Sequence, residues 1–250
     1  MKLKSWLLTG FIIVLLMFSS ISFAKVDEWI KKADMSTARG YLSTSEVNGK
    51  IYAIGGMNYV NGGVCTTLQA VEAYDPALDK WTVMTNMPTS RCYMIACTVN
   101  GKIYAIGGMT SVAASCSNVE EYDPTSNRWT KKNGMPIARF CLAGAVVKGR
   151  IYAIGGATDM VLQGNNGVEI CTLAVEEYDP VSDKWIEKAD MPTARFGFAA
   201  AEVNNKIYAI GGISSNMWLS TVGEYDTGFA GESVEAQGKL ATNWGEIKKQ

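Results

Sequence analysis

Four arginines are spaced regularly enough to suggest a shared site. They are Arg39, Arg91, Arg139 and Arg195, separated by 52, 48 and 56 residues. Guanidinium groups that converge on one place can bind a carboxylate or a phosphate through paired hydrogen bonds. The alternative is that each arginine bonds backbone carbonyl groups of a neighbouring element. The four arginines are therefore candidate ligand-binding residues for an anionic group.

Two glutamates offer a second kind of chemistry. Glu46 and Glu202 each lie seven residues after one of these arginines, and two carboxylates in one site could act as acid and base. The alternative is that both are solvated or paired with arginine. The chain has no histidine, which removes the commonest general base and metal ligand. With no nucleophile, phosphate-loop or zinc motif either, we predict no catalytic residue, no metal and no cofactor.

One nine-residue stretch organises the elements that must position these side chains. It reads Asn-Gly-Lys-Ile-Tyr-Ala-Ile-Gly-Gly at residues 100–108 and recurs with few changes at 48–56, 148–156 and 204–212. The pattern predicts a turn, a short buried strand, and a glycine pair where the backbone passes close to another segment. Four copies in one chain indicate a repeat architecture.

Aromatic residues repeat in step with the glycine pairs. Each repeated tryptophan lies 26 residues before a glycine pair, and all length variation falls between the glycine pair and a Tyr-Asp pair. One loop per unit is therefore free to vary, whereas the rest is scaffold. The residues predicted to be structural anchors are Trp29, Trp81, Trp129, Trp185, Gly55, Gly56, Gly107, Gly108, Gly155, Gly156, Gly211, Gly212, Tyr74, Tyr122, Tyr178 and Tyr225.

A unit of about 50 residues with Gly-Gly, Tyr-Asp, Trp and Met-Pro-x-x-Arg resembles the kelch repeat. The resemblance covers residues 28–226, although the first copy has Met35-Ser36 in place of Met-Pro. It implies an all-β fold, a kelch-type β-propeller with four blades of four antiparallel strands. The predicted propeller occupies residues 25–226, with repeats at 29–75, 81–123, 129–179 and 185–226.

The order of the anchors predicts how the last blade is completed. The first unit opens on a strand that carries Trp29, whereas the last ends at Tyr225-Asp226 with Glu232 where a tryptophan would stand. We expect the Trp29 strand to complete the last blade and leave no open edge. A monomer follows from this closure. The alternatives are an open arc and a dimer of two arcs.

The resemblance also implies a role for the arginines. In kelch domains of ubiquitin-ligase adaptors, arginines at the matching positions line the mouth that takes an acidic peptide. The variable loops add Tyr59 and Trp218, which could stack on a sugar or anchor a protein. The alternative is that these two rings cover the small core of their own loop.

We therefore expect a non-catalytic module that binds a protein, peptide or glycan through the variable loops and the arginines. The alternative is an exported sugar-handling enzyme, similar to kelch proteins that mutarotate sialic acid. Copper oxidases built on kelch-type propellers resemble the chain in fold only, because their copper site uses histidines. A formal net charge of −1 provides no basic stripe for nucleic acid.

The first 24 residues have the pattern of a secretory signal peptide. Lys2 and Lys4 precede an apolar run at 6–18, and a small-x-small site ends at Ala24. We expect export to the periplasm, the cell surface or the medium, and no membrane span in the mature chain. Residues 227–250 fall outside the repeat and are expected to form a linker and tail.

Six cysteines in an exported chain can be oxidised. Three of them fall in variable loops and two just after repeat arginines, locations that the chain reversals place on one face. We predict the disulfide bonds Cys65–Cys92 and Cys116–Cys141, which leaves Cys97 and Cys171 free or paired with each other.

Overall fold

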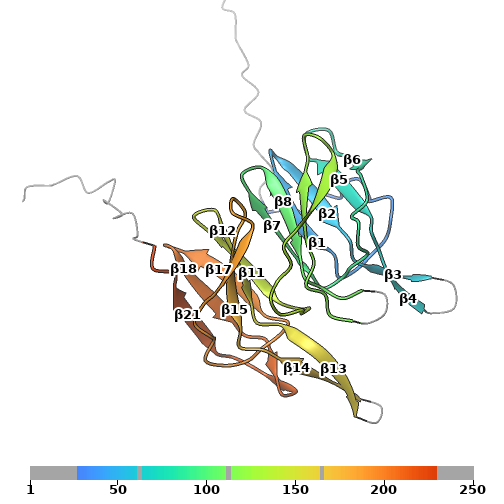
Figure 1. The fold of residues 1–250 in the computed structure, drawn as a ribbon. Helices are drawn as coiled ribbons and strands as arrows, with labels where there is room; N and C mark the ends of the chain where they lie inside the picture. The colour runs from blue at the N-terminus through green and yellow to red at the C-terminus, as the bar shows by residue number, and fades with distance from the viewer. Residues whose placement is uncertain (1–26, 61–63, 111–113, 164–165, 230–250) are drawn as a thin grey trace, which may run out of the picture. The chain divides into compact units, whose positions relative to one another are not determined.

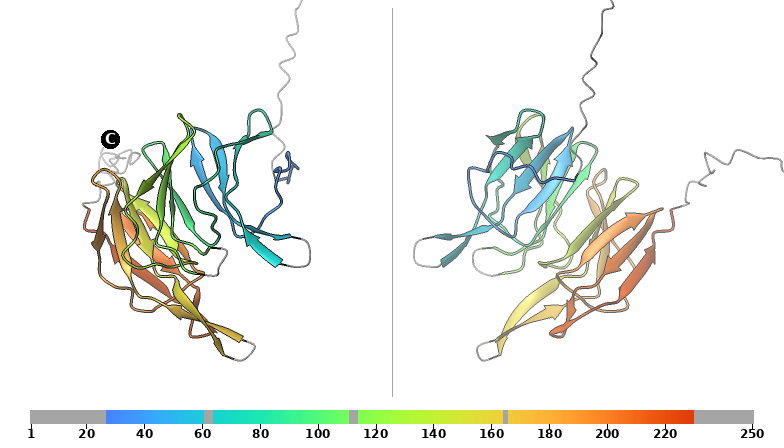
Figure 2. Two further views of the ribbon diagram at one scale, coloured as in Figure 1. Left: turned by 45° about the vertical axis from the view of Figure 1, so that its right-hand side comes forward. Right: turned by 180° about the vertical axis from the view of Figure 1, so that it is seen from behind.

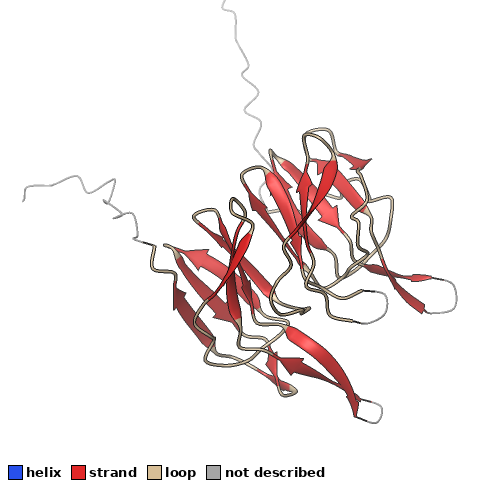
Figure 3. Ribbon diagram, viewed as in Figure 1, coloured by secondary structure: helices blue, strands red, loops and turns tan. Residues whose placement is uncertain are grey.

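The computed structural model describes residues 27–60, 64–110, 114–163 and 166–229. The chain divides into two units, residues 1–32 and 33–250. Every regular element in the described ranges is a β-strand, as Figure 3 shows. No described segment forms a helix that is long and apolar enough to cross a membrane.

Four antiparallel sheets follow one another along the chain (Figure 1), which makes the protein an all-β, four-bladed propeller. The first blade contains β1 (Ser43–Val47), β2 (Lys50–Ile54), β5 (Val71–Asp75) and β6 (Lys80–Val83). The second contains β7 (Ile95–Val99), β8 (Lys102–Ile106), β9 (Val119–Asp123) and β10 (Arg128–Lys132). The third contains β11 (Ala143–Val147), β12 (Arg150–Ile154), β15 (Val175–Asp179) and β16 (Lys184–Glu187). The fourth contains β17 (Ala199–Val203), β18 (Lys206–Ile210) and β21 (Val222–Asp226).

Three of the variable loops contain small hairpins of their own. The views of Figure 2 show two of these hairpins extending beyond the sheets of their blades. The hairpin strands are β3 (Met57–Val60) with β4 (Val64–Thr67), β13 (Ala157–Gln163) with β14 (Asn166–Cys171), and β19 (Ile213–Ser214) with β20 (Met217–Trp218).

The repeated Lys-Ile-Tyr-Ala-Ile segment forms the second strand of every blade. In β8, all four residues from Ile103 to Ile106 are buried, because neighbouring blades cover both faces of this strand. A tight hairpin joins it to β7, and both Asn100 and Gly101 have positive φ, 50° and 73°. Asn-Gly is the dipeptide that favours such a turn.

The core lies between successive blades and repeats with them. One blade contributes the tyrosine and the second isoleucine of its second strand, and the next contributes the first isoleucine and the alanine of its own. The matching sets are Tyr52 and Ile54 with Ile103 and Ala105, Tyr104 and Ile106 with Ile151 and Ala153, and Tyr152 and Ile154 with Ile207 and Ala209.

The fourth blade differs from the expected one. Its sheet has three described strands, and β21 pairs with β18 alone. Residues 27–32 form no strand, and the Trp29 side chain is fully exposed. In the other blades a tryptophan ring packs on the tyrosine of the adjacent strand. Tyr225 keeps the contact with a tyrosine of the preceding blade, Tyr152 at 6.1 Å, that Tyr122 and Tyr178 also make. The strand that we expected at Trp29 is therefore not formed in the described residues.

All six cysteines are free thiols, so neither predicted disulfide bond is formed. The sulfur atoms of Cys92, Cys116 and Cys171 contact backbone groups. The Cys92 thiol donates to the Met109 carbonyl at 3.8 Å, and the Cys116 sulfur accepts from the Asn118 amide at 3.3 Å. The pKa of Cys92 is raised to about 11, mainly by burial and to a smaller extent by the neighbouring Cys65.

Candidate functional site

The predicted arginine site is best described from the second blade. Arg91 is fully buried. Its Nη1 donates to the carbonyl oxygens of Gly107 at 2.7 Å and Asn118 at 3.0 Å, and its Nη2 donates to Glu120 Oε2 at 2.7 Å. The arginine therefore joins the glycine pair, the end of the variable loop and strand β9 within one blade.

The first and third blades repeat the ion pair, and in all three blades Nη2 of the arginine also donates to the alanine carbonyl of the second strand. Arg39 pairs with Glu72 at 2.9 Å, and Arg139 pairs with Glu176. The side chains of all four residues are buried. Because a buried charge needs a partner, these contacts occupy the guanidinium groups inside the protein. Arg39, Arg91 and Arg139 thus do not form the open, arginine-lined mouth that we expected.

Two of these carboxylates have different surroundings. Burial raises the pKa of Glu72, but hydrogen bonds from the Ser36 hydroxyl and amide and the charge of Arg39 bring it below its ordinary value. Burial dominates at Glu176 and raises its pKa despite Arg139. Arg139 donates to Glu176, but Pro136 occupies the position of Ser36 in that repeat and has no hydroxyl or amide hydrogen to donate.

Arg195 of the fourth blade has different partners. Its Nη1 donates to the carbonyl oxygens of Gly211 at 2.8 Å and Thr221 at 3.1 Å, as Arg91 Nη1 does with the matching carbonyls of the second blade. Its Nη2 donates to the Thr221 hydroxyl at 2.9 Å instead of a carboxylate. Burial lowers the pKa of Arg195.

The repeated tyrosines and tryptophans lie in the scaffold. In the second blade the Tyr122 hydroxyl donates to Asn127 Oδ1 at 2.7 Å, and the Tyr122 ring lies 4.9 Å from that of Trp129. The indole nitrogen of Trp129 donates to the Thr85 carbonyl, in the connection between blades. The first and third blades repeat these contacts with Tyr74 and Trp81 and with Tyr178 and Trp185.

The glycine pairs tie each variable loop to the next repeat. The amide of the second glycine donates to the carbonyl of the next repeat's arginine, from Gly56 to Arg91 and from Gly108 to Arg139, both at 2.9 Å. Gly156 donates to the Arg195 carbonyl in the same way at 2.8 Å, so the hairpins that follow Gly56 and Gly156 are anchored at their bases. Tyr59 is 76% exposed and Trp218 is 84% exposed.

Tyr59 borders an open depression in the first blade. The depression has a volume of about 400 Å³ and is lined by residues 38–41 and 57–59, so it includes Arg39, Tyr41 and Tyr59. Tyr41 is itself 59% exposed, and its ring lies 4.5 Å from that of Tyr93. Trp218 belongs to the hairpin of another blade and is not among the residues that line this depression.

Tyr41 and Tyr93 were not among the site residues predicted from the sequence. Both have positive φ, 53° and 54°, a conformation that L-residues adopt at a cost. The Tyr93 amide donates to the Tyr41 carbonyl at 3.1 Å, and the Cys141 amide donates to the Tyr93 carbonyl at 2.9 Å. These bonds link neighbouring blades. The available sequence signal was Arg-x-Tyr, which occurs at 39–41 and 91–93.

The two glutamates considered as an acid–base pair have local partners. Glu46 accepts from the Gly49 amide and Glu202 from the Asn205 amide, both at 2.6 Å. Each closes the hairpin turn after the first strand of its blade, at the end of that strand away from the repeat arginine. They do not form the paired site.

Comparison with known proteins places these features in a family. A family model described as the Kelch motif matches residues 38–88, 90–136 and 194–229. Beta-scruin of Limulus polyphemus is 31% identical over 194 residues, which are 76% of this chain and 21% of the scruin. Kelch-like protein 23 of Mus musculus is 29% identical over 202 residues, 80% of this chain and 33% of that protein.

A shorter match and a solved structure complete the comparison. The Influenza virus NS1A-binding protein homolog of Mus musculus is 37% identical over 92 residues, 36% of this chain and 14% of that protein. These three matches span a third or less of each relative's length. The structure of YjhT is similar in fold, with a TM-score of 0.64 at 18% identity, and covers 74% of this chain and 63% of that one.

Proposed function

Since the chain belongs to the kelch-repeat family, we propose that it is a non-catalytic interaction module whose ligand is a protein, a peptide or a glycan. The name of one relative, the NS1A-binding protein homolog, describes a protein-binding role for that protein. The residue chemistry supports the proposal, because three arginines and two glutamates that could have served catalysis are engaged in internal contacts.

The observation that carries the proposal is the depression between Tyr41 and Tyr59. Its two aromatic side chains are exposed. A β-bridge between Gly40 and Met57 joins the backbone segments that carry them and so fixes their relative position. Tyrosine supplies a large contact area at a low cost in conformational entropy and is enriched at binding hot spots. Arg39 is among the residues that line the same depression, although its side chain is buried against Glu72.

The test is a binding screen followed by substitution. Immobilised protein is screened against peptide and glycan arrays, and each hit is measured with Tyr41→Ala and Tyr59→Ala variants. Loss of one hot-spot aromatic costs about 2 kcal/mol or more, which weakens affinity at least tenfold. Leu78→Ala is the control, because Leu78 is equally exposed but follows β5, outside this depression. Unchanged affinity in both tyrosine variants would rule out the depression as the site.

We also propose that the protein is exported. The pattern of residues 1–24 supports this proposal, and these residues lie outside the described ranges. N-terminal sequencing of the expressed chain should begin at Lys25, and an intact Met1 on protein recovered from the cell exterior would contradict cleavage.

A further inference from the structure

The fourth blade departs from the other three at one buried position. The second residue of the third strand is glutamate in the first three blades, Glu72, Glu120 and Glu176, and Gly223 in the fourth. The positions are equivalent, because each lies opposite the alanine of the Lys-Ile-Tyr-Ala-Ile strand. The blade therefore lacks the carboxylate that pairs with the repeat arginine elsewhere.

The arginine itself is retained. Arg195 is 1% exposed and is held by the carbonyl oxygens of Gly211 and Thr221, the counterparts of those that hold Arg91. No ion pair joins it to an acidic side chain in the part of the chain that the structure describes. A guanidinium remains charged in proteins, and a buried charge without a counter-ion is costly.

The space of the missing side chain is open. A Cβ added to Gly223 would meet only the Pro192 ring, at 4.0 Å. A small pocket of about 50 Å³ lies here between the third and fourth blades, with Arg195 and Gly223 in its lining. Its apolar wall is formed by Ile154, Val175, Met191, Ile207 and Ala209.

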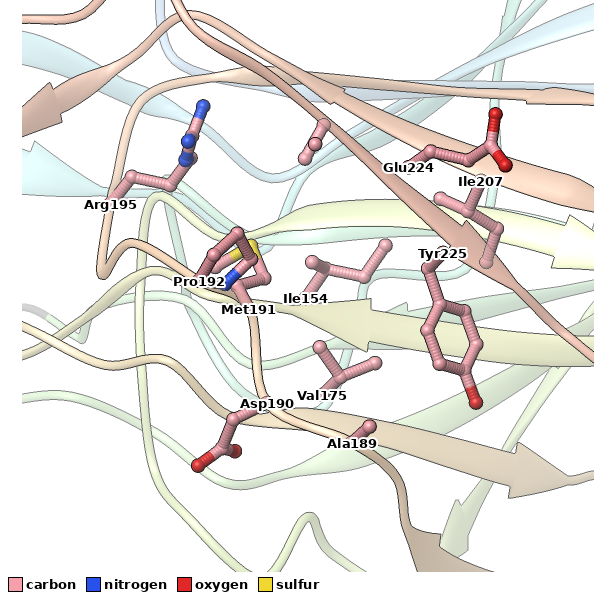
Figure 4. A pocket seen from close by; sticks show the side chains of 12 residues that line it. Ile154, Val175, Ala189, Asp190, Met191, Pro192, Arg195, Ile207, Glu224 and Tyr225 are labelled. Atoms are coloured by element: carbon pink, nitrogen blue, oxygen red, sulfur yellow. The ribbon is translucent and has the colours of Figure 1, made fainter.

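The acidic residues of this pocket do not replace the missing glutamate. Figure 4 shows the Arg195 side chain at one end of the pocket, apart from the carboxyl groups of Asp190 and Glu224. Glu224 instead accepts from the Lys206 ammonium at 2.5 Å. The positive charge of Arg195 is thus available to a group that enters from outside.

We propose that this pocket binds a carboxylate carried on a short aliphatic chain, with the carboxylate taking the place of the missing glutamate side chain beside Arg195. The second blade shows the same interaction within the protein. There the Glu120 carboxylate accepts from Arg91 and also from the Thr89 hydroxyl, both at 2.7 Å. Thr193 occupies the position of Thr89 in the fourth repeat. The aliphatic stem packs on the apolar wall.

Two sources can supply this chemistry, a free short-chain acid and the acidic side chain of a peptide. The probes are butyrate, with butyramide as its neutral control, and the peptide acetyl-Ala-Glu-Ala-amide, with its glutamine analogue as control. Binding is followed by isothermal titration calorimetry on the whole protein. We expect a charged probe to bind at least tenfold more tightly than its neutral control. Binding of butyrate would show that a free short-chain acid is enough to fill the pocket. Binding of the peptide but not of butyrate would identify the acidic side chain of a peptide as the ligand.

Two substitutions at one position complete the test. Gly223→Glu restores the internal carboxylate and should weaken binding of the charged probe at least tenfold, while raising the urea midpoint of unfolding. Gly223→Gln fills the same space without charge and should raise that midpoint less. Two outcomes overturn the proposal: no probe binds the folded wild-type protein, or Gly223→Glu binds the charged probe as the wild type does. Neither bears on the depression at Tyr41 and Tyr59, which lies on another blade.

Discussion

At the scale of single residues, one side chain type has two electrostatic environments in the same fold. Arg91 and Arg195 donate to equivalent backbone carbonyls. Only Arg91 also pairs with a buried carboxylate, that of Glu120. A comparison of the two sites therefore separates the contribution of the carbonyl contacts to the free energy of unfolding from that of the ion pair.

We predict that Arg91→Met destabilises the protein more than Arg195→Met. Removal of Arg91 leaves Glu120 as a buried, uncompensated charge, which costs about 3–5 kcal/mol. Removal of Arg195 forfeits hydrogen bonds to Thr193, Gly211 and Thr221 but leaves no buried carboxylate without its partner, which costs about 1–3 kcal/mol. Urea unfolding at pH 7 measures both free energies. Equal losses would mean that the Glu120 carboxylate contributes nothing through its charge.

At the scale of the elements, the glycine pair connects two blades. Gly107 has a φ of 65°, and a Cβ there would lie 2.8 Å from the carbonyl oxygen of Arg139 in the next repeat. Gly211 has nearly the same φ, 67°, but its Cβ would meet nothing closer than the Leu219 oxygen at 3.4 Å. The two glycines share a backbone conformation, but only Gly107 has a backbone atom of the next repeat close to the position of a Cβ.

Alanine substitution at these two positions should therefore have unequal effects. Both variants force a left-handed conformation on an L-residue, at about 1–2 kcal/mol. Gly107→Ala adds a backbone clash and should lose clearly more stability than Gly211→Ala. Thermal unfolding of both variants beside the wild type checks the order. A larger loss at Gly211 would show that its surroundings are tighter than the structure indicates.

The strands were predictable because their information is local. The segment Lys-Ile-Tyr-Ala-Ile recurs with its turn and its glycine pair, so each copy supports the others. The pairing of arginine with glutamate was not predicted, because the partners lie 29 residues apart in the second blade and 37 in the third, across the variable loop. The signal was present as Val-Glu at 71–72, 119–120 and 175–176, broken by Val222-Gly223.

The expected strand at Trp29 shows a different limit of sequence analysis. Periodicity established that Trp29 is of the same type as Trp81, but a strand also needs an edge to pair with. Residue spacing carries no information on whether that edge is reached. Of the exposed aromatic pair, Tyr59 was predicted and Tyr41 was not. The two are brought together by the bridge between Gly40 and Met57, which joins segments on either side of a hairpin, and residue spacing does not show such a contact.

At the scale of the whole molecule, equivalent apolar side chains are not equally buried in the different blades. The second strand of the second blade ends at Ile106, which is fully buried against the third blade, whereas the equivalent Ile210 of the fourth blade is 45% exposed. Val222 likewise is 60% exposed, although the equivalent Val119 is fully buried. Stability should therefore fall from the middle blades to the fourth.

Amide hydrogen exchange should reveal this gradient. Local opening frees amides at a rate set by the packing around them, so segments with one face exposed exchange before the core. We expect the amides of β21 to exchange at least tenfold faster than those of β9, its counterpart in the second blade. Strand β18 serves as the internal control, because it is paired on both sides within the fourth sheet and should exchange more slowly than β21. Mass spectrometry of peptides from each strand measures the rates. Equal protection of β21 and β9 would mean that the apolar face of the fourth blade is covered in solution.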